Sequence, residues 1–168
     1  MPARYVRYFA LAYGIVFLLV GIAGFIPGLV APPPVGPEGL AVDEGFGRLF
    51  GLFPVNVLHN LVHLAFGVWG LAAYRTFSAS RLYARAVAVI YAILAVMGVI
   101  PGLNTLFGLV PLYGHDVWLH IVLAVVAAYF GWARVRPEDE RVVATPTTTT
   151  DRTTTTDRTG TERPGRRL

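Results

Sequence analysis

The sequence predicts an all-α, polytopic membrane protein with four transmembrane helices in two tandem two-helix repeats. Of its 168 residues, 55% are hydrophobic and only 14% are charged, whereas a soluble domain carries about 25% charged residues. The apolar residues gather in long blocks, and parts of the chain repeat one another. This composition argues against a water-soluble enzyme. The chain also contains no cysteine, which excludes a disulfide framework, a thiolate metal site and a cysteine nucleophile.

Four apolar blocks are long enough to be membrane spans, since about 20 helical residues cover the roughly 30 Å of a bilayer's hydrocarbon. The blocks cover approximately residues 8–26, 55–74, 82–100 and 116–132. Pro27-Gly28 and Pro101-Gly102 end the first and third blocks, and Pro54 precedes the second. Asp116 is expected to cap the N-terminus of the fourth.

The charges predict how these spans are oriented. Arginines precede the first span, flank the second connection and follow the fourth span: Arg4, Arg7, Arg75, Arg81, Arg85, Arg134 and Arg136. The other connections hold the acidic residues and one arginine: Glu38, Asp43, Glu44, Arg48 and Asp116. Because positive residues stay on the cytoplasmic side, we expect a multi-pass protein of the cell membrane with both termini in the cytoplasm.

The composition changes sharply near residue 138, which divides the chain into a membrane domain (1–137) and a tail (138–168). The tail repeats the letters TTTTDR and has almost no apolar surface, so it is expected to be disordered and cytoplasmic. Its arginines are balanced by acidic residues. A nucleic-acid tail would show a basic excess, and we therefore expect no nucleic-acid partner.

An internal repeat relates the two halves of the membrane domain. Arg7–Leu29 aligns with Arg81–Leu103, and Leu49–Pro54 aligns with Leu106–Pro111 in a second register that also places His63 on His120. Each copy crosses the membrane twice, so a pseudo-twofold axis along the membrane normal should relate them. Because the first block belongs to this repeat, it is expected to be a retained helix and not a signal peptide.

The segments that follow the first and third spans are also predicted from this repeat. Phe46, Leu49, Phe50 and Phe53 recur at helical spacing, which favours a short amphipathic helix on the outer surface. A shorter relative is expected around Thr105–Val110. A plain hydrophobic loop folded over the bundle is the alternative.

Three sequence stretches resemble the bacterial membrane proteins grouped as domain of unknown function 4383. They are FPVNVLHNLVHLAFG (Phe53–Gly67), IPGLNTLFGLVP (Ile100–Pro111) and HDVWLH (His115–His120). The resemblance covers roughly Arg7 to Arg134. It implies a four-helix integral membrane protein with no established activity, and it supplies no catalytic residue.

Polar residues inside the predicted spans are the candidate functional residues, because each costs free energy in a membrane unless it is paired. The second span carries Asn56, Asn60 and His63 on one face, with His59 beside them, and the fourth carries Asp116 and His120. These faces should meet or line a shared cavity. The second and fourth helices are therefore expected at the centre of the bundle.

Three interpretations of these residues remain open. In the first, they are structural, with Asn56 and Asp116 as helix caps and the histidines bonded across the interface; the protein is then a structural or interaction module without a cofactor. In the second, His59, His63 and His120 hold a divalent metal, or His63 and His120 hold a haem. In the third, the histidines, His115 included, and Asp116 are titrating groups in a small-solute or proton pathway.

The sequence offers no catalytic constellation, so no enzymatic activity is expected. The only serines, Ser78 and Ser80, lie on the predicted cytoplasmic side, away from every histidine. The expected partners are the lipid bilayer and either a second copy of the chain or another membrane protein.

Overall fold

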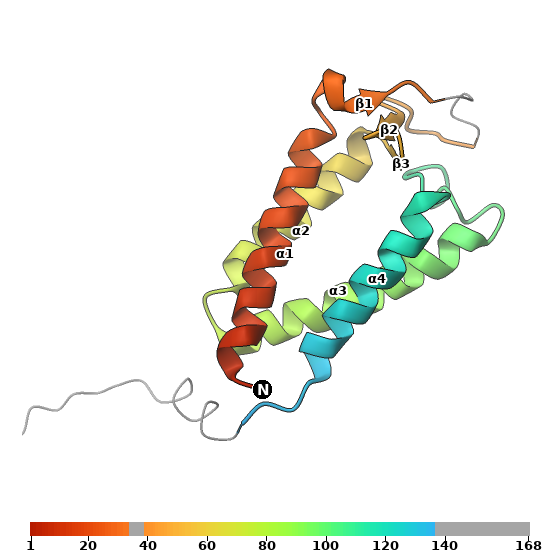
Figure 1. Cartoon of the computed structure of the whole chain (residues 1–168). Helices are drawn as coiled ribbons and strands as arrows, with labels where there is room; N and C mark the ends of the chain where they lie inside the picture. The colour runs from red at the N-terminus through yellow and green to blue at the C-terminus, as the bar shows by residue number, and fades with distance from the viewer. Residues whose placement is uncertain (34–38, 137–168) are drawn as a thin grey trace, which may run out of the picture.

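The computed structural model describes residues 1–33 and 39–136, which form an elongated four-helix bundle with a small β-sheet at one end (Figure 1). The helices are α1 (Ala3–Ala23), α2 (Val57–Ala73), α3 (Phe77–Val99) and α4 (His115–Trp132). Of these, α1, α3 and α4 are long and apolar enough to cross a membrane, and α2 is a shorter apolar helix of 17 residues. The architecture is that of a helical membrane protein. The predicted tail and Glu38 lie outside the described residues.

Two helices begin earlier than the apolar blocks predict. Helix α1 begins at Ala3, and α3 begins at Phe77, where the Thr76 side chain accepts a hydrogen bond from the Ala79 amide at 3.2 Å. Arginine is a good helix former, and its long side chain keeps its charge at the membrane surface while the helix continues. The charged residues at these ends therefore extend the helices instead of preceding them.

The connection between α1 and α2 is a three-stranded antiparallel sheet in the order β1 (Val30–Ala31), β2 (Gly47–Leu49) and β3 (Phe53–Val55). The predicted amphipathic helix is therefore wrong. Phe50 and Gly51 have φ angles of 53° and 73°, a left-handed conformation that turns the chain back on itself and cannot continue an α-helix. The alternative of a hydrophobic segment folded over the bundle is closer to the structure.

The shorter outer segment, residues 101–110, consists of turns, so the helix expected around Thr105–Val110 is also wrong. Leu106, Phe107 and Gly108 have φ angles of 47°, 58° and 86°. The two outer segments contact each other, since the amides of Ala41 and Val42 both donate to the Gly108 carbonyl. Together they cap the end of the bundle opposite the N-terminus (Figure 1).

The helices pack as two pairs, α1 with α2 and α3 with α4, and the main contact that joins the pairs is between α1 and α3. The expectation that α2 and α4 occupy the centre is wrong. Glycines explain the tight first pair: a Cβ atom added to Gly70 would lie 2.7 Å from the Gly14 Cα, so the two backbones touch. A buried apolar core links all four helices: Phe9, Ala10, Phe17, Ala73, Tyr83, Ala84, Val87, Ala88, Tyr91, Ala124 and Ala127.

Candidate functional site

Four buried polar side chains from α2 and α4 lie between the two helix pairs, near the capped end of the bundle. His59 and His63 are one turn apart on α2, and Asp116 and His120 are one turn apart on α4. Their exposed fractions are 4%, 8%, 3% and 3%, respectively. The α2 and α4 backbones do not form the central contact of the bundle. The polar side chains of these two helices nevertheless come together.

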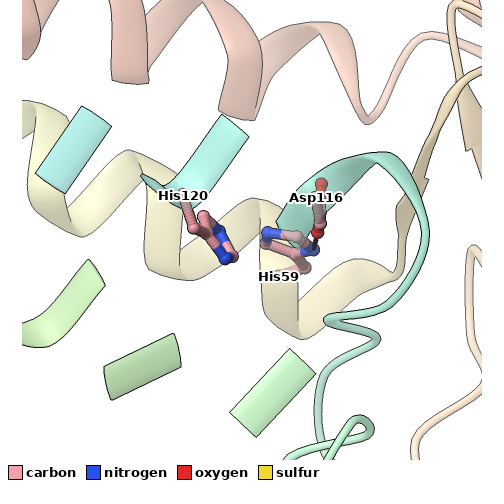
Figure 2. A group of neighbouring side chains, drawn as sticks. All are labelled: His59, Asp116 and His120. Carbon is pink, nitrogen blue, oxygen red and sulfur yellow. Dashed lines mark ion pairs between the residues drawn. The ribbon is translucent and has the colours of Figure 1, made fainter. Parts of the chain in front are cut away.

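Three of these residues point toward one another, as Figure 2 shows for His59, Asp116 and His120. The Nδ1 atom of His59 lies 3.8 Å from Oδ2 of Asp116. One potential ligand atom from each of the three residues lies within 4.8 Å of the others. His63 is their neighbour, with its ring centroid 4.7 Å from that of His59. The predicted metal set of His59, His63 and His120 thus differs from the set that the structure groups, in which Asp116 takes the place of His63.

Four atoms in this cluster are buried without a hydrogen-bond partner in the part of the protein that the structure describes. They are Nδ1 of His59, His63 and His120, and Oδ2 of Asp116. Leaving such an atom unpaired costs about 1–3 kcal/mol, and native proteins rarely do so without a bound ion or water or a functional reason. The described side chains and backbone therefore leave these four polar atoms of the cluster unsatisfied.

Aromatic side chains from α1 and α3 hold two of the histidine rings. The Phe17 ring meets His63 edge-on at 5.5 Å between centroids, and the Tyr91 ring meets His120 edge-on at 5.0 Å. Phe17 and Tyr91 also contact each other, with centroids 5.5 Å apart. The sequence interpretation did not assign either residue to the site. The available signal was the repeat, which aligns Phe17 with Tyr91 while it aligns His63 with His120.

The two asparagines have structural roles. The Asn56 side chain accepts a hydrogen bond from the His59 amide at 2.8 Å, so Asn56 caps α2 as predicted. Its Nδ2 atom donates to the Val42 and Leu109 carbonyls at 2.7 and 2.8 Å. Asn60 donates to the Gly24 carbonyl at 2.8 Å. Asn56 thus joins both outer segments to the first turn of α2, directly beside His59.

His115 and Asp116 do not occupy the positions that the sequence suggests. His115 is exposed and accepts a hydrogen bond from the Trp118 indole at 3.1 Å, so it lies outside the buried cluster. The N-cap of α4 is Gly114, with φ 68°, and the prediction that Asp116 caps this helix is wrong. Asp116 instead lies in the first turn, where the positive end of the helix dipole favours a carboxylate.

The chemistry of this donor set suits a divalent transition metal. Imidazole and carboxylate ligands bind Zn²⁺, Fe²⁺ and Mn²⁺, and two histidines with one carboxylate leave further coordination positions open. Ligand bonds of about 2.0–2.2 Å place neighbouring donors roughly 3–4 Å apart. The 3.8 Å pair already has this spacing, and rotation of the imidazoles would bring the widest pair, at up to 4.8 Å, into range.

Comparison with known proteins agrees with the resemblance in the sequence. A family model described as a domain of unknown function (DUF4383) matches residues 7–133. No curated protein and no solved structure matches the chain significantly. The matched region contains α2, α3 and α4 and nearly all of α1, and with them every member of the buried cluster. The chain therefore belongs to the DUF4383 family of domains of unknown function.

Proposed function

We propose that all four helices, α2 included, cross the membrane. At 1.5 Å per residue, the 17 residues of α2 cover about 25 Å, a few ångströms less than the hydrocarbon thickness. A mismatch of this size is accommodated at modest cost by thinning of the bilayer or by flanking residues. Leu61 and Val68 of α2 are 49% and 61% exposed, which suits a helix that faces lipid.

The proposed orientation places the N-terminus and the end of α4 in the cytoplasm of the cell. The arginines at the start of α1 and α3 and after α4 belong to the end of the bundle that holds the N-terminus (Figure 1). Asp43 and Glu44 belong to the capped end. This separation is what the positive-inside rule requires.

The proposed two-copy architecture is supported by contacts that correspond in the two halves. Arg7 donates from Nε to the Tyr74 carbonyl at 2.9 Å, and Arg81 donates from Nε to the Gly131 carbonyl at 3.2 Å. The repeat aligns Arg7 with Arg81, and in its second register it aligns Tyr74 with Gly131. Each copy therefore joins its first helix to the end of its second helix in the same way.

Two further correspondences support the same proposal. The left-handed pair Phe50-Gly51 aligns with the left-handed pair Phe107-Gly108. The edge-on contact between Phe17 and His63 aligns with that between Tyr91 and His120, with interplanar angles of 86° and 89°. A pseudo-twofold axis between α1 and α3 would relate these pairs and would place the histidine cluster close to it.

We infer that this membrane module binds a divalent metal ion through His59, Asp116 and His120. The observation that carries the proposal is that three potential ligand atoms from two helices converge within 4.8 Å. Nδ1 of His59, Nδ1 of His120 and Oδ2 of Asp116 are buried and have no hydrogen-bond partner among the described residues, so the cluster has unused ligand capacity. The carboxylate also supplies negative charge to a cation in a site that membrane and protein shield from water. His63, one turn from His59, would support the site from the side.

The other interpretations of the cluster have less support. A structural role predicts hydrogen bonds between the histidines and the facing helix, yet the Nδ1 atoms have none within the described residues. A haem between His63 and His120 would have to displace the Phe17 and Tyr91 rings that pack against them. A transmembrane pathway would have to cross the apolar core between the cluster and the cytoplasmic end.

Cobalt titration of the purified chain tests the metal proposal, because Co²⁺ bound by imidazole and carboxylate gives visible absorption bands that report its coordination. We expect saturation at one Co²⁺ per chain, and His120→Ala should abolish the bands. The matched control is His115→Ala, which removes an exposed histidine outside the cluster and should titrate like the wild type. Equal spectra for both variants would contradict the assignment.

A further inference from the structure

An apolar groove runs along the outside of the bundle between α1 and α4. It has a volume of about 540 Å³ and is lined at one end by Met1 and Tyr5, and further along by Phe9, Tyr13 and Val126. The groove exists because α1 and α4 make far less contact with each other than each makes with its own partner. From Ala3 to Tyr13, α1 rises about 15 Å, which matches the roughly 15 Å of hydrocarbon in one leaflet.

The corresponding position between α2 and α3 is filled by the protein itself. The register that aligns His63 with His120 also aligns Trp69 with Val126. The Trp69 ring packs edge-on against Tyr83 of α3, with centroids 5.2 Å apart. Valine at position 126 is too small to fill the equivalent space against α1. The groove is thus a difference between two otherwise corresponding halves.

The backbones of two arginines contact Met1 at the cytoplasmic end of the groove, and a third arginine follows Met1 closely in the chain. The Arg136 amide donates to the Met1 carbonyl at 3.3 Å, and the Arg134 carbonyl accepts a hydrogen bond from the Met1 nitrogen at 2.6 Å. Both arginines are exposed, and so is Arg4 in the first turn of α1. Tyr5 and Tyr129, which are 45% and 63% exposed, line the groove. Amphipathic aromatic rings of this kind are enriched at the headgroup level of membranes.

We infer that the groove binds one anionic phospholipid of the cytoplasmic leaflet. An acyl chain would occupy the apolar channel beside Val126, and the phosphate would lie among Arg4, Arg134 and Arg136. Basic residues at a membrane surface attract anionic headgroups, and arginine binds phosphate through several donors at once. This inference rests on the proposed placement in the membrane, and it is independent of the metal site.

Native mass spectrometry of the full chain tests this inference, with phosphatidylglycerol and phosphatidylcholine of identical acyl chains as probes. We expect one retained phosphatidylglycerol and at least tenfold weaker retention of phosphatidylcholine. Val126→Trp, which copies the filled half, should lose the bound lipid. The matched control Val125→Trp changes a neighbouring valine that is 64% exposed and should retain it. Arg134→Gln with Arg136→Gln should reduce phosphatidylglycerol retention to the level of phosphatidylcholine.

Three results would overturn the inference. Equal retention of both lipids by the wild type would show that the arginines do not recognise the anionic headgroup. Equal retention by Val126→Trp and Val125→Trp would show that the lipid lies elsewhere. A wild-type dimer that only Val126→Trp dissociates would assign the groove to a second copy of the chain. Metal content measured on the same variants distinguishes this inference from the metal proposal. A variant that loses lipid binding in the groove should still bind metal like the wild type.

Discussion

The Nδ1 atom of His59 lies 3.8 Å from Oδ2 of Asp116, with both side chains buried and neither atom hydrogen-bonded within the described residues. This distance is too long for a hydrogen bond, but it suits two ligands of one metal ion. The residues come from α2 and α4, which belong to different helix pairs. A metal at this position would therefore connect the two halves of the bundle.

Asp116→Asn should weaken divalent metal binding by about 100-fold or more, since even partners behind the ligands contribute 10–100-fold. The amide has nearly the same shape as the carboxylate but lacks its charge. The measurement is competitive Co²⁺ titration of the purified protein. Asp43→Asn, which alters an exposed acid at the capped end, is the control and should bind like the wild type. Unchanged affinity in Asp116→Asn would exclude the carboxylate as a ligand.

Asn56→Ala should lower the free energy of unfolding by about 3 kcal/mol. It removes a helix cap worth about 1 kcal/mol and leaves the Val42 and Leu109 carbonyls without their donor. Denaturation in mixed micelles, followed by circular dichroism, measures the loss. Asn104→Ala is the matched control, because the Asn104 side chain makes no hydrogen bond in the described part of the chain, and its effect should stay within about 0.5 kcal/mol. Similar losses in both variants would contradict the role of Asn56.

Gly70→Leu should destabilise the protein by about 1–3 kcal/mol or more, because the new side chain has no space against the Gly14 backbone. Thermal unfolding in detergent gives the comparison. Ala72→Leu introduces the same side chain two residues away at an exposed position and should unfold close to the wild-type temperature. If Gly70→Leu were equally stable, the close contact between α1 and α2 would be wrong.

Cysteine labelling tests the proposed orientation, and the natural chain contains no cysteine that would interfere. Gly28→Cys places a thiol at the capped end, where an added Cβ meets no other atom within 4 Å. Ser78→Cys places one at the opposite end, at an exposed position. In intact spheroplasts, a membrane-impermeant maleimide should label only Gly28→Cys, and permeabilisation should expose Ser78→Cys. The reverse pattern would invert the topology.

The helical part of the fold was predictable from sequence because long apolar blocks and Pro-Gly pairs identify helices and their ends directly. Each predicted span overlaps one observed helix. The outer sheet was not predictable in this way. Phe46, Leu49, Phe50 and Phe53 fit helical spacing, and the spacing does not indicate that Phe50 has a left-handed conformation. The same limit applies to the central contact between α1 and α3, which depends on how the two pairs join.

The residues of the candidate site were predictable from the sequence, but which of them lie together as potential metal ligands was not. Polar residues inside apolar helices identified His59, His63, Asp116 and His120. Helical spacing along α2 favoured His59 and His63 as joint ligands, because it describes only neighbours on one helix. The juxtaposition of Asp116 with His59 depends on the register between α2 and α4, which no local pattern contains.

Elemental analysis tests metal binding by this cluster, with wild-type protein purified without chelators and then offered Zn²⁺, Fe²⁺, Mn²⁺ and Co²⁺ in turn. We expect one tightly held divalent ion per chain. We also expect His59→Ala and His120→Ala to lose this ion and His115→Ala to keep it. Absence of any stoichiometric metal from the folded wild type, or equal metal content in all three variants, would contradict metal binding by this cluster.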